Sequence, residues 1–374
     1  MSGARGRGVR TRSRRAKAAT TLAGPPRTAW RRAVWAGLLA VVVSLRASAG
    51  PLHLRQAPSE PARRVAHVGI GRVQALAFSP VGGRLAVATT GALELWNPET
   101  WEREAVLPVD SGKPFPRSLS LSFSGNGAVL AVGSSRHPSG DIALWSMTSL
   151  TVVATLNESP RRTGGVGAVK LSSDGSVLAA YTHRGKVELW DIQSMALLRI
   201  VDGGPDINLS PDGSLLTMAG QGGVARVWDV ATGAAFARIE GQAGGTAGTP
   251  VEFSPDGTML ATVHGWDGQV WVRLWELPSH RKVGTLEDEG HHIETLAFSS
   301  DGARLAAAGG DEVVRLWDVR SSRLVARYKG HRGRINSLSF SADGALLASG
   351  GGGVVLVWNV ATGRVRRAPW PDRP

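Results

Sequence analysis

The stretch "VEFSPDGTML" occupies residues 251–260, and its Ser-Pro-Asp-Gly core returns in varied form along most of the chain. Each copy follows a short apolar run. The serines of the seven copies are Ser79, Ser124, Ser172, Ser210, Ser254, Ser299 and Ser341. They lie 38 to 48 residues apart, which is a period typical of repeat architectures. The sequence therefore predicts one supersecondary unit repeated seven times.

Every repeat carries the same strand and turn signals. Val251 and Phe253 alternate into the turn, where Ser, Pro and Gly at the first, second and fourth positions favour a tight type I turn and hence a hairpin. An alternating strand that ends in Trp follows, such as "VVRLWDV" at 313–319, and then a more variable strand, such as "RLVARY" at 323–328. Without helical periodicity between these strands, each repeat is predicted to be a four-stranded antiparallel sheet.

These features resemble the WD-repeat β-propeller family. The resemblance rests on "FSPDG", on "LWDV" and on the pairs Gly290-His291 and Gly330-His331, and it covers about residues 63–362. It implies an all-β fold, a seven-bladed β-propeller of four-stranded antiparallel blades, with Trp and apolar side chains filling the spaces between blades. One blade cannot bury its faces alone, so the unit must be repeated until the ring closes.

The resemblance also implies a set of structural residues. In the family, a His after Gly, a Ser or Thr on the second strand, an Asp before the third strand and the Trp form a buried hydrogen-bonded set. The residues that match are Trp96, Trp145, Trp190, Trp228, Trp275, Trp317, Trp358, His291, Asp311, His331 and Ser349. Ala307 stands at a Ser position, and Gly351 to Gly353 leave no Asp. No blade keeps all four residues, so we expect apolar packing to stabilise the sheets more than this network does.

Two segments compete for the last outer strand of the ring. The strand "RRVAHV" at 63–68 precedes the first repeat, and "GRVRRAP" at 363–369 follows the last. The second is rich in Arg and ends in Pro369, which cannot donate to a strand ladder. We therefore predict that the N-terminal strand closes the ring.

The first 49 residues read as an export signal. They hold eleven basic and no acidic side chains, followed by an apolar stretch from Ala33 to Leu45 and by Ala47-Ser48-Ala49. Arg31-Arg32 before the apolar stretch resembles a twin-arginine signal. A membrane-spanning helix is the rival, but thirteen residues reach only about 20 Å of a roughly 30 Å hydrocarbon core. A start codon placed too far upstream is a further alternative. The predicted organisation is 1–49 signal peptide, 50–62 linker and 63–374 propeller, in an exported, periplasmic or secreted protein without stable membrane insertion.

The charge of the chain is concentrated in that first segment. The formal net charge is +13, but residues 50–374 carry 32 basic and 30 acidic side chains. Without a long basic stripe for a phosphate backbone, nucleic-acid binding is not expected. The chain also has no cysteine, so disulfides, thiolate metal sites and a cysteine nucleophile are excluded.

The sequence favours a non-catalytic protein. His291 and His292 with Asp311 suggest a metal site, but His291 and Asp311 fall on structural positions of the repeat, which favours the structural interpretation. No zinc helix, phosphate-binding loop or nucleophile elbow is present. The aspartates of the repeated turns lie on different blades, too far apart for paired acid-base work. We therefore predict no cofactor and no catalytic site.

Irregularities in the repeat indicate a partner surface. The second and fifth repeats each hold about three extra residues, which we place in loops at 134–141 and 263–270. The second loop contains Trp266, an expected interface anchor, beside Asp267 and His264. Arg136, His137, His183 and Arg184 are candidates for the same surface.

The predicted function is that of an exported, monomeric propeller, a rigid non-catalytic scaffold that binds a protein or peptide. The alternative is a propeller enzyme or ligand-binding protein, hydrolase or lactonase-like, with a site in the central channel. A propeller hosts many functions on one scaffold, so the partner is not identified by the sequence.

Overall fold

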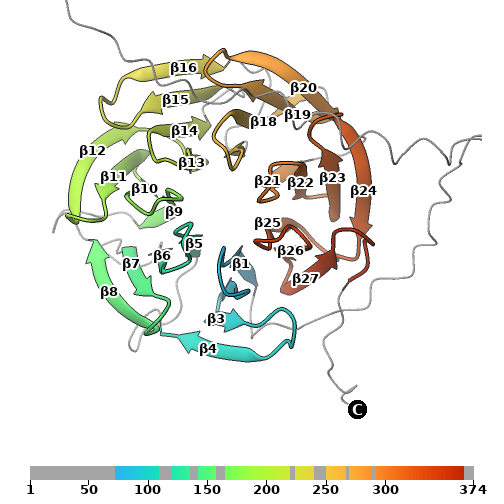
Figure 1. Ribbon diagram of the computed structural model, residues 1–374, viewed down its shortest axis with the longest axis horizontal. Coiled ribbons are helices and arrows are strands. Elements are labelled where there is room, and N and C mark those ends of the chain that lie inside the picture. The colour runs from blue at the N-terminus through green and yellow to red at the C-terminus, as the bar shows by residue number, and fades with distance from the viewer. Residues whose placement is uncertain are drawn as a thin grey trace, which may run out of the picture. The chain divides into compact units, whose positions relative to one another are not determined.

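The computed structural model describes residues 72–108, 119–134, 142–156, 165–219, 224–239, 250–266, 269–288 and 292–365. They form seven antiparallel sheets arranged as blades around a ring (Figure 1). Six sheets have four strands each, and the last has three. The predicted all-β, seven-bladed propeller is confirmed. The predicted boundaries at residues 49 and 62 lie outside the described residues.

Each blade is built from strands in chain order, from the centre of the ring to its rim (Figure 1). The strands of blades one and two are β1 (Val73–Phe78), β2 (Leu85–Thr89), β3 (Leu93–Trp96), β4 (Arg103–Leu107), β5 (Leu119–Phe123), β6 (Val129–Ser134), β7 (Ile142–Ser146) and β8 (Thr151–Leu156). Those of blades three and four are β9 (Val166–Leu171), β10 (Val177–Thr182), β11 (Lys186–Asp191), β12 (Ala196–Asp202), β13 (Ile207–Leu209), β14 (Leu215–Ala219), β15 (Ala225–Asp229) and β16 (Ala235–Ile239). Those of the last three blades are β17 (Val251–Phe253), β18 (Met259–Trp266), β19 (Gln269–Glu276), β20 (Arg281–Glu287), β21 (Ile293–Phe298), β22 (Arg304–Gly309), β23 (Val313–Asp318), β24 (Arg323–Lys329), β25 (Ile335–Phe340), β26 (Leu346–Gly351) and β27 (Val354–Asn359).

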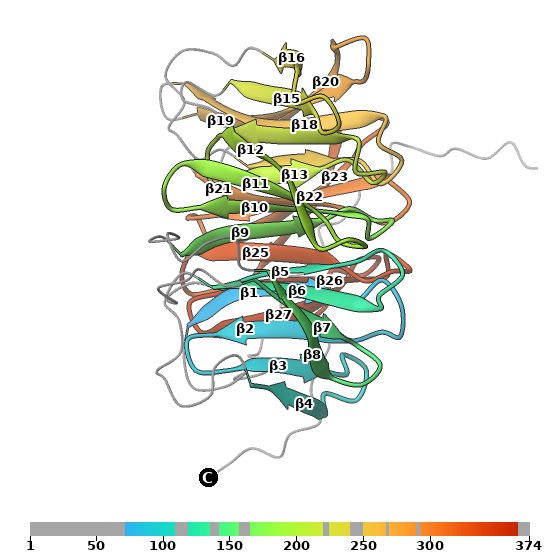
Figure 2. The same cartoon turned by 90° about the vertical axis from the view of Figure 1, so that its left-hand side faces the viewer.

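The strands run through the thickness of the ring (Figure 2), so the connections of each blade emerge at two opposite ends. Because neighbouring strands are antiparallel, the turn after the first strand and the turn after the third strand share one end, called here the hairpin end. The turn after the second strand and the connection to the next blade share the other, called here the link end.

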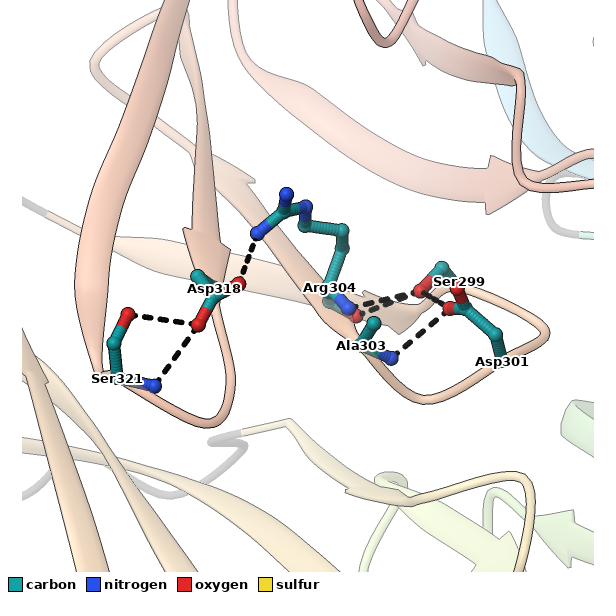
Figure 3. Close-up of polar contacts among 6 residues, drawn as sticks. All are labelled: Ser299, Asp301, Ala303, Arg304, Asp318 and Ser321. Atoms are coloured by element: carbon teal, nitrogen blue, oxygen red, sulfur yellow. Dashed lines mark hydrogen bonds and ion pairs between the residues drawn. The ribbon is translucent and has the colours of Figure 1, made fainter. Parts of the chain in front are cut away.

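The repeated turn is held by its own side chains, as in blade six (Figure 3). The Ser299 hydroxyl donates to Asp301 Oδ1 over 2.5 Å, and the Arg304 amide donates to Ser299 Oγ over 2.9 Å. Asp301 Oδ1 also accepts from the Ala303 amide at 3.0 Å. These hydrogen bonds hold the pKa of Asp301 below its usual value, with that from Ser299 contributing most. The side chains thus fix the turn that joins β21 to β22.

Neighbouring turns also contact one another around the hairpin end. The Gly125 amide of blade two donates to Ser173 O of blade three, and the Ser173 amide donates to Pro211 O of blade four, both at 2.8 Å. Gly257 has φ +71°, and a Cβ there would lie 3.4 Å from Pro211 Cδ of the preceding blade. Only glycine adopts that backbone conformation easily. The turn is therefore repeated because each copy both folds its own hairpin and contacts the next blade.

The apolar core lies between the blades. Each buried cluster combines side chains of neighbouring sheets: for example, Leu144 of blade two packs with Val169 and Trp190 of blade three. Blades seven and one are joined in the same way, because Leu347 and Trp358 share a cluster with Val73. The ring is thus closed by packing between the last and the first blade.

Hydrogen bonds between inner strands reinforce this closure. Ser337 and Ser339 of β25 accept from the amides of Leu76 and Phe78 of β1, at 3.0 and 2.9 Å. The Asn336 side chain donates to Val73 O at 2.9 Å. The junction between blades seven and one is therefore bridged by side chains that reach the unpaired edge of the neighbouring strand.

The predicted closing strand is not confirmed. Residues 63–68 lie outside the described residues, while Val365 forms an antiparallel bridge with Trp358 at the outer edge of β27. In blade six, Leu324 at the start of β24 pairs with Trp317 in the equivalent way. Gly363, with φ +66°, ends the preceding turn, and its amide donates to Asn359 O at 2.8 Å. The described residues thus place the C-terminal segment, the rejected alternative, at the start of the outer strand.

We expect a chain that ends after Val360 to be less stable, since it loses the bridge from Val365 and the hydrogen bond from the Gly363 amide to Asn359 O. The melting temperature should fall by roughly 4 °C or more. A chain that ends after Arg366 retains both contacts and is the matched control. Unchanged melting of the shorter chain, together with unfolding when residues 50–69 are deleted, would restore the N-terminal strand as the closing element.

Candidate functional site

The inner strands around the central channel differ among blades. Two residues before the turn serine, blades one, two, six and seven carry the small side chains Ala77, Ser122, Ala297 and Ser339. At the same position, blades three to five carry Lys170 of β9, Asn208 of β13 and Glu252 of β17. All seven strands line the centre of the ring (Figure 1). Large polar side chains thus gather on one side of the channel.

An ion pair spans this side. Lys170 Nζ lies 3.7 Å from Glu252 Oε2, although the two residues belong to blades three and five. Asn208 lies between them, and its Nδ2 donates to Val251 O at 3.4 Å. The Lys170 and Glu252 side chains remain 37% and 25% exposed.

Asp206 adds a second carboxyl to this group, which we call the channel cluster: Lys170, Asp206, Asn208 and Glu252. Asp206 Oδ2 is buried and has no hydrogen-bond partner among the described residues. Burial raises the pKa of Asp206 to about 6, and the nearby Lys170 opposes that rise. Burial also raises the pKa of Glu252, against the opposing effects of Lys170 and Asn208. Groups that titrate near neutral pH are frequent at functional sites.

The channel cluster can bind polar ligands and exchange protons. An ammonium group near two carboxyls offers both a hydrogen-bond donor and hydrogen-bond acceptors. In the described ranges, no group of three or more His, Cys, Asp or Glu side chains is arranged to hold a metal ion.

The unusual pKa of Asp206 has a consequence for stability. Its folded-state pKa, about 6, exceeds the ordinary value of 3.8, so the folded protein binds this proton more tightly and loses stability as the pH rises through 6. We expect Asp206→Asn to match the parent at pH 4 and to exceed it by about 1–3 kcal/mol in free energy of unfolding at pH 8. Urea unfolding at both pH values measures this difference.

Asp212 of the same blade is the matched control. The Ser210 hydroxyl lowers its pKa, so its contribution to stability is present above the unfolded value and is lost as the pH falls. Asp212→Asn should therefore destabilise the protein at pH 8. Equal effects of the two substitutions would contradict the proposed environment of Asp206.

The structure corrects the place of His264. We expected its side chain in a loop at the partner surface, but it is 1% exposed in β18. Its Nε2 lies 2.7 Å from Thr262 Oγ1, which also accepts from Trp275 Nε1 at 2.8 Å. Burial, with a smaller effect of Arg273, lowers the pKa of His264 to about 4. His264 thus lies inside the blade and cannot contact a partner.

The extra residues of blade five do not form a loop either. β18 extends to Trp266, which pairs with Gln269 of β19, so only residues 267 and 268 connect the two strands. Asp-Gly is a preferred pair for such a two-residue hairpin. The side chain of Trp266 and all of Asp267 lie outside the described residues, as do Arg136, His137 and His291. Trp266 therefore ends a strand on the link end.

His183 and Arg184 are exposed at the link end. They form the turn between β10 and β11, and the His183 ring lies edge-on to Tyr181, with centroids 6.3 Å apart. These two are the only predicted partner residues whose side chains the structure both describes and leaves exposed.

The indole N–H groups of the structural tryptophans donate to different acceptors in different blades. In blade seven, Trp358 donates to Ser349 Oγ at 2.8 Å, and His331 Nε2 lies 2.6 Å from the same oxygen. Burial lowers the pKa of His331 to about 4. In blades one and three, Trp96 and Trp190 donate instead to carboxylates two residues earlier in the same strand, Glu94 and Glu188. Trp145, Trp228 and Trp317 have no partner for Nε1 among the described residues.

Blade six has an ionic network at the positions of the family set. Arg315 Nη2 pairs with Asp311 at 2.5 Å, and its Nε pairs with Asp288, also at 2.5 Å. Arg327 pairs with the other oxygen of Asp288. The Arg315 and Asp288 side chains are 6% and 5% exposed. Asp311 therefore contacts an arginine of its own blade within a buried network.

Several of these residues escaped sequence reasoning. Glu94 and Glu188 precede their tryptophans by two residues, a spacing along the strand that places both side chains on one face. The channel cluster becomes visible only when the seven inner strands are aligned on their turn serines, because Lys170, Asn208 and Glu252 then replace small residues. Both signals are departures from the repeat, and a search for recurring residues does not detect them.

Comparison with known proteins agrees with this architecture. The family model "WD domain, G-beta repeat" matches residues 281–318 and 322–359, which span β20–β23 and β24–β27. The chain is a WD-repeat propeller. The two matches cover blades six and seven with the outer strand of blade five, and the ring supplies the other blades. No curated protein matches the chain. Across the described part of this WD-repeat chain, no helix is long and apolar enough to cross a membrane.

Proposed function

We propose that this WD-repeat propeller is exported and serves as a non-catalytic scaffold that binds a protein or peptide at its link end. The observation that carries the proposal is the closed WD-repeat ring, because WD repeats generally mediate protein–protein interactions. A ring whose blades are locked on both sides offers connections on a rigid support, which lowers the entropy cost of binding. Export is proposed from residues 1–49, which lie outside the described residues.

The proposed surface includes the exposed turn of His183 and Arg184. Trp266, Asp267, Arg136 and His137 are proposed for the same surface from the sequence alone. His264 is excluded by its burial. An exposed arginine at the rim of an interface mainly affects the association rate and its salt dependence.

Co-purification of the mature chain from exported material, followed by mass spectrometry, tests the scaffold. We expect a stoichiometric protein partner and an N-terminus at Gly50. Arg184→Glu should weaken binding several-fold in low salt and leave the melting temperature unchanged. Arg320→Glu, a charge reversal at an exposed position of the hairpin end, is the control. Recovery of the chain without any partner, or with residues 1–49 intact, would contradict the proposal.

A second candidate function, ligand binding or hydrolysis in the central channel, is favoured by the channel cluster. The mature protein can be assayed against a panel of esters and lactones. Turnover that is lost in Lys170→Met and in Asp206→Asn, but kept in Asp212→Asn, would favour the enzyme over the scaffold. We expect no turnover above that of the variants.

A further inference from the structure

Exposed basic residues lie at the link end where blades six, seven and one meet. His292, Arg334 and Arg72 each immediately precede an inner strand, namely β21, β25 and β1. These three strands lie side by side around the channel (Figure 1). The three side chains are exposed, and so is Arg332, two residues before Arg334. We call these four residues the basic rim.

The connection that carries Arg332 and Arg334 is fixed at both ends. His331 is 6% exposed and bound to Ser349, and Ile335 is fully buried. Between these anchors the connection lies directly on the turn of Gly351 to Gly353, since a Cβ on Gly351 would overlap the backbone oxygen of Arg334. The arginines therefore project from a backbone that is held in place. Such support reduces the ordering cost of binding.

The turn of Gly351 to Gly353 also lacks the acidic residue that WD repeats usually have there. In the family, an aspartate stands before the third strand, and here Gly351 to Gly353 occupy that turn. The turn that faces the backbone of Arg332 therefore carries no acidic side chain.

Few carboxylates of the described residues neutralise the basic rim. Glu294 pairs with Arg334, whose side chain stays 72% exposed. Glu312 is exposed on the neighbouring turn of blade six. Asp288 and Asp311 are bound by arginines of the buried network. No ion pair in the described part of the chain involves Arg72 or Arg332. Among the described residues, positive charge therefore remains in excess at this side of the ring.

We propose that the basic rim is the docking surface for an acidic segment of the protein partner, an inference that rests on the proposed scaffold function. Guanidinium groups bind carboxylates with two parallel hydrogen bonds, so Arg72 and Arg332 suit Asp and Glu side chains. The basic residues lie at one side of the ring centre and do not form the long stripe that follows a phosphate backbone. Outside its first 49 residues the chain is also nearly neutral. An acidic polypeptide thus fits the rim better than a nucleic acid does.

Binding of a short, fluorescein-labelled oligo-glutamate peptide to the mature chain tests the proposal by fluorescence anisotropy. We expect binding that weakens with added salt and that falls by about tenfold or more when Arg72→Glu and Arg332→Glu are combined. Arg320→Glu is the matched control, since Arg320 is exposed in a turn at the hairpin end. An oligo-lysine peptide of equal length should not bind. Each variant must keep the parent melting temperature, and Arg72→Gln with Arg332→Gln replaces the charge reversals if they unfold the protein.

Three outcomes would overturn the inference. The first is that the rim variant binds oligo-glutamate as tightly as the parent. The second is that Arg320→Glu loses as much oligo-glutamate affinity as the rim variant. The third is that single-stranded DNA or phosphatidylglycerol vesicles bind the rim more tightly than oligo-glutamate does. A protein partner that co-purifies with the parent and binds the rim variant normally would also overturn the rim while the scaffold function stands. Absence of any partner would instead count against the scaffold itself.

Discussion

Each blade has two apolar faces, and only its neighbours on either side can cover both. This constraint determines the rest of the structure. A four-stranded sheet that buries one face against a neighbour still exposes the other, so stability requires that the series of blades return to its beginning. The junction of blades seven and one is thus as necessary as any other. It combines a shared apolar cluster with hydrogen bonds that amides of the first inner strand donate to Ser337 and Ser339.

Because packing between blades stabilises the ring, the buried hydrogen-bonded groups inside the blades can differ from one blade to the next. The indole N–H binds a hydroxyl in blades five and seven and a carboxylate in blades one and three. In blade six, a buried network around Arg315 occupies the equivalent region. Partnering a buried polar group contributes only about 1 kcal/mol, whereas burial of a large apolar side chain contributes about 2–3 kcal/mol. Apolar packing therefore sets the architecture, and the polar sets differ from blade to blade.

The sequence predicted what recurs, because recurrence is a strong signal of a repeated physical requirement. The turn serines and the tryptophans gave the number of blades and the order of strands. Single departures were predicted less well.

The segment 230–233 and the segment 360–363 share the sequence "VATG". The first leads into an outer strand, which identifies the C-terminal segment as the start of another outer strand. Pro369 argues against a strand only at its own position, so it does not exclude a strand that begins before it. In blade five, the sequence predicts a loop at 263–270, but β18 and β19 pair as far as Trp266 and Gln269, so that only residues 267 and 268 connect them. The channel cluster was missed for another reason: the proximity of Lys170 to Glu252 depends on the curvature of the ring, which joins residues that are 82 positions apart in sequence.

The closed ring is tested most directly by amide hydrogen exchange at its junction. The amides of Leu76 and Phe78 donate to serines of blade seven, and those of Val169 and Leu171 donate to Ser120 and Ser122 in the same way between blades two and three. If the ring closes as described, all four amides exchange with the same high free energy of opening, that of global unfolding. Exchange of Leu76 and Phe78 much faster than that of Val169 and Leu171 would show that the junction opens by itself and would contradict a ring closed between the last blade and the first.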